Sequence, residues 1–143
     1  MNGYLVDTSV LSALAPGRPE PAQRAKDLFL EAGSRLYVPS MAIAEIARGI
    51  AKLRRSGAST RADALAAWLD ELERAYADHV LPFDGAVARL AGAMDDAATA
   101  RGRHPGLADV IIAATAAVHG LTVLSANGKH FEALEVPTID PFA

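Results

Sequence analysis

The chain has 143 residues and a net charge of −3, and 51% of its residues are hydrophobic. This length suits one domain with a sizeable core, and the apolar fraction favours a globular fold over disorder. The absence of cysteine excludes disulfide scaffolds and thiolate metal sites, and it suits a reducing cytoplasm. Because the net charge is negative, any contact with nucleic acid must use a local basic patch or a metal ion.

No apolar run approaches the roughly 18 residues that a membrane span needs. The N-terminus lacks the basic and apolar pattern of a signal peptide. We therefore expect a cytoplasmic protein that makes no membrane contact. No linker, repeat or low-complexity segment interrupts the sequence, so we expect one domain over residues 1–143.

The hydrophobic pattern switches between strand-like and helical periods along the whole chain. The expected strands cover residues 3–6, 35–40, 79–83, 121–125 and 136–140. The expected helices cover residues 8–14, 20–32, 40 to about 53, 59–79, 85 to about 102 and 106–120. Ser40 and Asp84 stand where they could cap the helices that follow them. Strands separated by helices predict an α/β fold, with a mostly parallel twisted sheet of four to five short strands flanked by helices on both faces.

Asp7 directly follows the first expected strand, within YLVDTSVL (4–11). Ligands of open parallel sheets bind beyond the carboxyl ends of the strands, at the point where the strand order reverses. Ser125 and Asn127 lie just past the end of another expected strand, so these two ends are predicted to meet at one cleft. Asp7 alone is equally compatible with a structural role, as the cap of the helix that starts at Thr8.

Asp109 interrupts a helix that is otherwise largely apolar and is therefore expected in the core. It falls in the first turn, where the helix dipole favours a negative charge. Ala113 and Ala116 share its face of the helix, and such small neighbours would leave room for an ion. The alternative is that Asp109 is only an N-terminal helix acid.

Glu45 lies off the isoleucine stripe of its helix, one turn before Gly49. A glycine in a helix costs about 1 kcal/mol relative to alanine, and here it would let another group approach the carboxylate. The alternative is a solvated Glu45 that is paired with Arg48.

Together the three acids mean more than each alone. Converging carboxylates repel one another unless a cation lies between them. Ligation by oxygen alone is what Mg²⁺ and Mn²⁺ prefer. Zinc is disfavoured because cysteine is absent and the histidines, expected on surfaces or at helix ends, form no close pair in the sequence.

Four stretches, taken in their order along the chain, carry a family resemblance: YLVDTSVLSAL (4–14), PSMAIAEIARGI (39–50), ADVIIAATAAVHGLTVLSANGKHF (108–131) and VPTIDPF (136–142). Together they resemble the PIN-domain ribonucleases and, more narrowly, a VapC-type toxin of a toxin–antitoxin pair. The resemblance implies a single PIN-like domain over residues 1–143. It also implies that Asp7, Glu45 and Asp109 are the catalytic and metal-ligating residues of an Mg²⁺- or Mn²⁺-dependent endoribonuclease.

The same resemblance makes Thr8 or Ser9 a hydrogen-bond donor beside the first acid. The sequence departs from the family at residues 125–131, where His130 stands in place of a frequent fourth acid. Asn127 could offer a neutral carbonyl to the metal or to its water, and the site could hold one ion instead of two. The candidates for phosphate contact are Arg48, Lys52, Arg54, Arg55 and Lys129.

The implied reaction is metal-assisted hydrolysis of RNA that leaves a 5′-phosphate and a 3′-hydroxyl. The implied partners are a VapB-type antitoxin, whose C-terminal segment blocks the acidic pocket, and a second copy of the chain in a homodimer. The main alternative is a PIN-like binding module with weak or lost catalysis. A phosphotransfer domain around Asp7 lacks a second nearby aspartate, and a nucleotide-binding domain lacks its glycine-rich phosphate loop.

Overall fold

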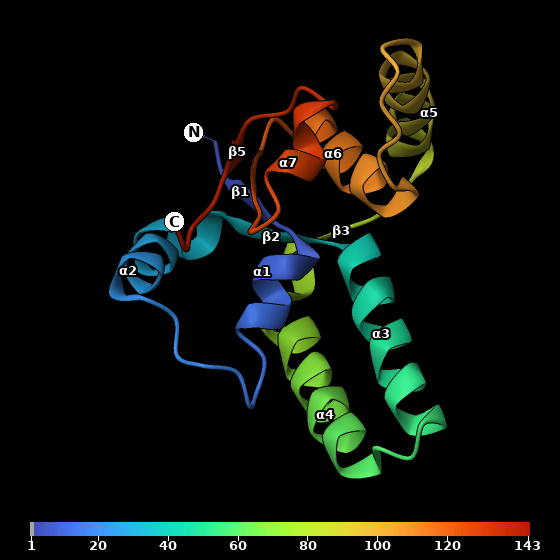
Figure 1. Cartoon of the computed structure of the whole chain (residues 1–143). Coiled ribbons are helices and arrows are strands. Elements are labelled where there is room, and N and C mark those ends of the chain that lie inside the picture. Colours follow the sequence, from blue (N-terminus) through green and yellow to red (C-terminus); the bar gives the residue numbers. More distant parts are fainter. Residues whose placement is uncertain (1) are drawn as a thin grey trace.

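The computed structural model describes residues 2–143. Within these residues, a parallel sheet of five short strands forms the centre of the molecule (Figure 1). The strands are β1 (Tyr4–Val6), β2 (Leu36–Pro39), β3 (Val80–Leu81), β4 (Thr122–Leu124) and β5 (Thr138–Ile139). The α-helices are α1 (Thr8–Ala13), α2 (Gln23–Ala32), α3 (Ser40–Arg55), α4 (Ser59–Ala75), α5 (Gly85–Ala100), α6 (Leu107–His119) and α7 (Lys129–Glu132). This arrangement confirms the predicted α/β fold.

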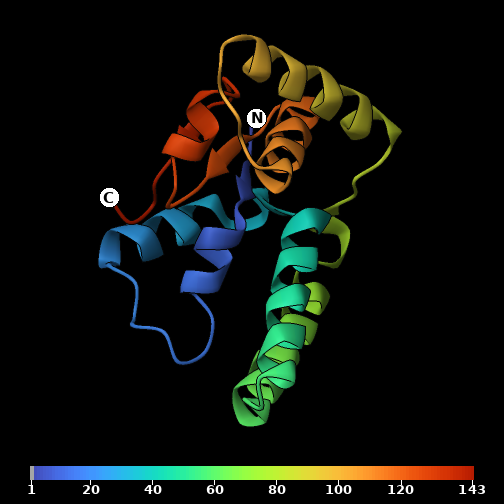
Figure 2. The same ribbon diagram turned by 45° about the vertical axis from the view of Figure 1, so that its right-hand side comes forward.

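The central strand β1 presents alternate side chains to two different helical layers. Leu5 is fully buried in a core shared with α5 and α6, whereas Val6 is buried in a core shared with α1, α3 and α4. Figures 1 and 2 show α5, α6 and α7 on one side of the sheet, and the packed pair α3 and α4 extending away on the other side. Because both faces are covered, the strands are mostly apolar instead of alternating regularly with polar residues.

The order of the strands in space is β3-β2-β1-β4-β5. The chain builds from β1 through β2 to β3 and then crosses over to place β4 on the other side of β1. The strand order therefore reverses between β1 and β4, which opens a crevice beyond their carboxyl ends. Asp7 and Ser125 directly follow these two strands, so the reversal places them at the crevice.

Two predicted helix starts need correction. The helix expected over 20–32 begins at Gln23, because Pro19 and Pro21 disfavour a helical conformation in the residues before them. Ser40 does not cap α3: Pro39 holds the cap position, and the Ser40 hydroxyl accepts a hydrogen bond from the Phe83 N–H at 3.1 Å. That contact ties α3 to the segment after β3. Asp84 does cap α5, since its carboxylate accepts the Val87 N–H at 3.1 Å.

Two further differences concern the end of one helix and the presence of another. The helix expected over 59–79 ends at Ala75, and a 3₁₀ turn, η2 (Ala77–His79), follows it. The short helix α7 lies in the stretch after β4, where no helix was predicted because four residues are too few for a periodic pattern. No helix within residues 2–143 is long and apolar enough to cross a membrane. The expectation of one domain over the whole chain stays a prediction.

Candidate functional site

The carboxyl ends of β1 and β4 meet as the sequence predicted. Val6 pairs with Leu124 in the sheet, and the Asp7 N–H donates to the Leu124 carbonyl at 2.9 Å. Beyond this edge lies a pocket of about 430 Å³. Its lining residues are Asp7, Thr8, Ser9, Ser12, Glu45, Gly106, Ala108, Asp109, Asn127 and His130. The three predicted acids therefore face one cavity, although they come from the residue after β1, from α3 and from α6.

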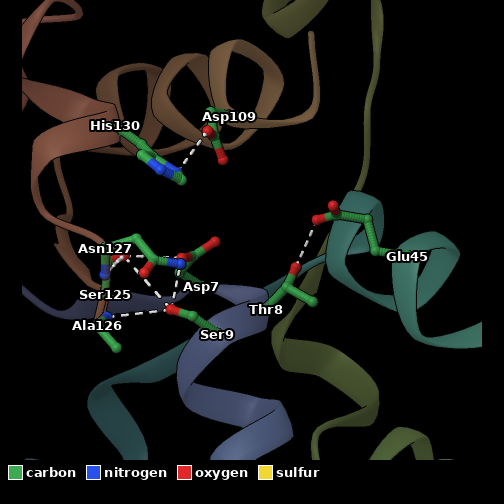
Figure 3. Close-up of polar contacts among 9 residues, drawn as sticks. All are labelled: Asp7, Thr8, Ser9, Glu45, Asp109, Ser125, Ala126, Asn127 and His130. Carbon is green, nitrogen blue, oxygen red and sulfur yellow. Dashed lines mark hydrogen bonds and ion pairs between the residues drawn. The ribbon is translucent and has the colours of Figure 1, made fainter. Parts of the chain in front are cut away.

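Asp7 is buried, with 4% of its surface exposed, and it precedes α1 in the cap position. Its side chain makes no capping hydrogen bond. Instead Oδ2 accepts the hydroxyls of Ser9 and Ser125, each at 2.8 Å (Figure 3). The interpretation of Asp7 as a side-chain cap is therefore wrong, because the carboxylate is held by these two hydroxyls and not by the helix backbone.

Both hydroxyls are themselves oriented by the backbone after β4. The Ser125 hydroxyl accepts the Asn127 N–H at 2.9 Å, and the Ser9 hydroxyl accepts the Ala126 N–H at 3.0 Å. Since each oxygen accepts a backbone hydrogen, each can direct its own hydrogen at Asp7. The sequence analysis missed Ser125 as a partner of Asp7. The signal was the parallel register, which places the residue after Leu124 beside the residue after Val6.

Glu45 projects from α3, and its Oε1 accepts the Thr8 hydroxyl at 2.6 Å. Thr8 and Ser9 are thus both donors to acids, but to different ones. Arg48 is exposed and does not pair with Glu45 within the described residues, so the predicted ion pair is wrong. At Gly49 a Cβ would meet no atom within 4 Å among the described residues, so no neighbouring protein group requires a glycine there. The approach of another group to Glu45 stays a prediction.

Asp109 lies in the first turn of α6, and 24% of its side chain is exposed. Its Oδ2 is 3.2 Å from Nδ1 of His130. Burial raises the pKa of Asp109 above its usual range, the Asp7 carboxylate adds to the rise, and His130 opposes it. The Glu45 carboxylate also raises this pKa, so both other acids repel the Asp109 carboxylate across the pocket.

The space beside Asp109 does not come from the small residues that the helical wheel suggested. Ala113 and Ala116 are fully buried in the core, whereas Gly106 and Ala108 line the pocket. The reason is that α6 is apolar nearly all round, so residues 110–116 are buried on every side. Only the first turn of α6 reaches the cavity.

The three carboxylates share one further property. Each uses one oxygen in a contact, and the second oxygen has no hydrogen-bond or ion-pair partner among residues 2–143. Unengaged carboxylate oxygens around one cavity are donors of the kind that Mg²⁺ and Mn²⁺ take. However, no group of three or more His, Cys, Asp or Glu within residues 2–143 is arranged so that it could hold a metal ion. The donor set fits such an ion in its chemistry, and the metal site stays a prediction.

Sequence comparison assigns the family. The family model of the PIN domain matches residues 4–136. The chain belongs to the PIN-domain family. It is 32% identical to Toxin FitB of Neisseria gonorrhoeae, with 96% of this chain and 97% of that protein covered. It is 31% identical to VapC ribonuclease Y4jK of Sinorhizobium fredii, with 96% of each protein covered.

Two crystal structures extend the comparison. The structure of FitAcB from Neisseria gonorrhoeae matches with a TM-score of 0.82 and 30% identity, covering 96% of this chain and 97% of the other. The structure of DNA-bound VapBC from Salmonella typhimurium matches with a TM-score of 0.82 over 99% of both chains. The second match is only 22% identical, so it shows the shared fold alone.

In this PIN domain the stretch SANGKHF (125–131) faces the pocket, and Asn127 and His130 both line it. His130 is exposed, as expected for the histidines, and it contacts Asp109. His79 is structural: it stacks on Tyr37 with ring centroids 4.5 Å apart. The imidazole of His130 therefore supplies a nitrogen and, when protonated, a positive charge to a pocket that otherwise holds carboxylates.

The predicted phosphate contacts separate into two groups. Arg54 pairs with Asp63 at 2.6 Å on the α3–α4 hairpin. Arg48, Lys52 and Arg55 also lie on α3 and do not line the acidic pocket. Lys129 alone of the five lies beside the acidic site, in an adjoining cavity.

Proposed function

We propose that this PIN-domain protein is a metal-dependent endoribonuclease and the toxin of a type II toxin–antitoxin pair. One observation carries the proposal: Asp7, Glu45 and Asp109 line one pocket at the carboxyl edge of the sheet, each with an unengaged oxygen. The family supports it, since relatives of about 31% identity are named as a toxin and as a VapC ribonuclease.

We assign Asp7, Glu45 and Asp109 as the ligands of Mg²⁺ or Mn²⁺. Such an ion would supply positive charge to the phosphate and the acidity that activates a water for attack. Ser9 and Ser125 fix the direction of Asp7, and Thr8 fixes Glu45. A carboxylate with a remaining lone pair would orient the water that attacks phosphorus. The P–O3′ bond breaks and the leaving 3′-oxygen takes up a proton, so that the products carry a 5′-phosphate and a 3′-hydroxyl.

The proposal extends to partners. The similar crystal structures are titled FitAcB and VapBC, and we propose an antitoxin of the VapB type for this chain. An antitoxin segment that covers the acidic pocket would block access of RNA. We also propose that the toxin forms a homodimer. Light scattering of the purified toxin, alone and with its antitoxin, measures both states.

Cleavage of a structured RNA by the purified, antitoxin-free protein tests the activity. We expect cleavage with Mg²⁺ or Mn²⁺ and none with EDTA. Asp7→Asn should lose this activity. Its matched control is Asp70→Asn, which makes the same chemical change at an exposed position on α4 outside the pocket lining. Asp70→Asn should cleave like the parent. Cleavage that resists EDTA, or products that end in a 2′,3′-cyclic phosphate, would contradict the mechanism.

A second candidate is a PIN-like binding module with weak or lost catalysis. Two observations favour it: no metal-binding group is formed within residues 2–143, and His130 engages one oxygen of Asp109. The same assay separates the candidates. A protein that binds its antitoxin tightly but does not cleave RNA with any divalent ion would be such a module.

A further inference from the structure

A second cavity of about 410 Å³ adjoins the acidic pocket. The two cavities share Gly106, Asp109 and His130, so the His130–Asp109 pair forms part of the wall between them. The other lining residues of the second cavity are Arg103, His104, Pro105, Lys129 and Ala133. We call it the basic pocket, because Asp109 is its one acidic lining residue within residues 2–143.

The backbone that carries the basic residues is fixed. The N–H groups of Gly102 and Arg103 donate to the carbonyls of Thr99 and Ala98, each at 2.9 Å, and close the end of α5. Gly102 adopts a positive φ of 75°, which glycine accepts at low cost. The Arg101 guanidinium donates to the Ala133 carbonyl and so joins the loop after α5 to the segment after α7. The two walls of the basic pocket are therefore tied together.

The charged side chains themselves are uncommitted. Arg103 and Lys129 are exposed and have no hydrogen-bond or ion-pair partner among residues 2–143. Arg54, by contrast, is engaged with Asp63. In a chain with a net charge of −3, free cations in a cavity that adjoins a cluster of carboxylates are suited to an anion.

We propose that the basic pocket binds a backbone phosphate of the RNA, next to the scissile linkage. This inference rests on the proposed function. An RNA strand that places one phosphate at the acidic pocket must carry its next phosphates past the same carboxylates, which repel them. Arg103 and Lys129 offset that repulsion on the α7 side of the site and fix the direction in which the strand leaves. Phosphate contacts of this kind position a strand without reading its sequence.

The first test measures binding, so that it does not depend on cleavage. A fluorescent single-stranded RNA is titrated with Asp7→Asn protein, alone and with Arg103→Ala or Lys129→Ala added, at several salt concentrations. Each lost contact should weaken binding and lower the slope of log affinity against log salt by about 0.7. Arg74→Ala is the matched control, since it removes the same charge from an exposed position on α4 outside both pockets. Equal effects of Arg103→Ala and Arg74→Ala would overturn the proposal.

The second test locates the phosphate. In a set of RNAs, each linkage in turn is replaced by a neutral methylphosphonate. The Asp7→Asn protein with Arg103 intact should lose affinity most when one linkage adjacent to the scissile one is neutral. With Arg103→Ala added, the protein should lose no further affinity at that linkage. If the loss from Arg103→Ala and the loss from the neutral linkage add up at every linkage, the basic pocket is overturned. Failure of the parent to cleave RNA with Mg²⁺ or Mn²⁺ would instead overturn the proposed function, while the binding result still decides whether the pocket holds phosphate.

Discussion

The two sides of the acidic pocket hold their carboxylates in different ways. On the sheet side, Asp7 is 4% exposed and two serine hydroxyls hold one of its oxygens. On the helix side, Asp109 contacts His130, whose side chain is 58% exposed. Asp7 is thus a fixed acid in an interior network, whereas Asp109 contacts an imidazole at the surface.

This difference indicates how the proposed ion would be accommodated, since no metal-binding group is formed within residues 2–143. The fixed Asp7 would set the position of the ion, and Asp109, whose partner is exposed, would adjust to it. We therefore expect substitutions on the sheet side to have the larger effects. The following predictions test that ranking, from the largest expected effect to the smallest.

Asp7→Asn should abolish RNA cleavage and leave the fold intact. Asparagine keeps an oxygen that can accept the Ser9 and Ser125 hydroxyls, and it removes a buried charge that repels Asp109. Without metal, the variant should melt at the same or a higher temperature than the parent. Mg²⁺ should stabilise the parent by RT ln(1 + [L]/Kd) and the variant clearly less. Thermal melts with and without Mg²⁺ measure both effects; equal gains in the two proteins would remove Asp7 from the metal site.

Ser125→Ala should destabilise the protein by about 1–3 kcal/mol, because it leaves the buried Asp7 carboxylate and the Asn127 N–H each short of a partner. Activity should fall by roughly 10–100-fold, as is typical when a partner of a metal ligand is lost. Urea unfolding and cleavage rates give the two values. Ser9→Ala is the comparison: Ser9 is less buried, so its loss should cost less stability. If Ser125→Ala behaves like the parent, the sheet side is not the fixed side.

His130→Asp should strengthen metal binding, because residue 130 faces the pocket and a carboxylate there adds an oxygen donor. Asn127→Ala should weaken metal binding if its carbonyl contacts the ion or its water. Neither change removes a group that holds Asp7, because Asn127→Ala keeps the backbone N–H that donates to Ser125, so the effects should be smaller than that of Asp7→Asn. Titration calorimetry with Mn²⁺ measures them. Parent-like affinity in both variants would place the stretch SANGKHF outside the metal site.

The pH dependence of stability should be a smaller effect. A carboxyl group with a raised pKa binds its proton more tightly in the folded chain than in the unfolded chain. Asp109 therefore lowers the stability of the metal-free protein as the pH rises from about 4, its ordinary pKa, through its raised pKa. The stability gained by Asp109→Asn should accordingly be small at low pH and fully present at neutral pH. Unfolding at several pH values measures this gain; a gain that does not change with pH would contradict the raised pKa.

Much of the fold could be predicted from the sequence, because periodicity reports burial directly. All five strands and the longer helices were found, and Asp7 and Asp109 were noticed because each interrupts an apolar segment. Errors arose where a local pattern was too short or was overridden. Serine is a common N-cap residue, yet the Ser40 hydroxyl accepts a hydrogen bond from the Phe83 N–H instead of capping α3.

The sequence by itself determined the α/β class, the order of the elements and two of the acids: Asp7 after β1 and Asp109 in the first turn of the apolar helix α6. Only the tertiary structure decided which groups those acids contact. Ser125 and Asp7 are 118 residues apart in the sequence. The Ser125 hydroxyl reaches Asp7 because parallel pairing aligns the strands that precede these two residues. Likewise, Arg103 and Lys129 share a cavity because the loop after α5 is tied to the segment after α7. Such neighbours follow from the packing of whole elements, which no local period of the sequence records.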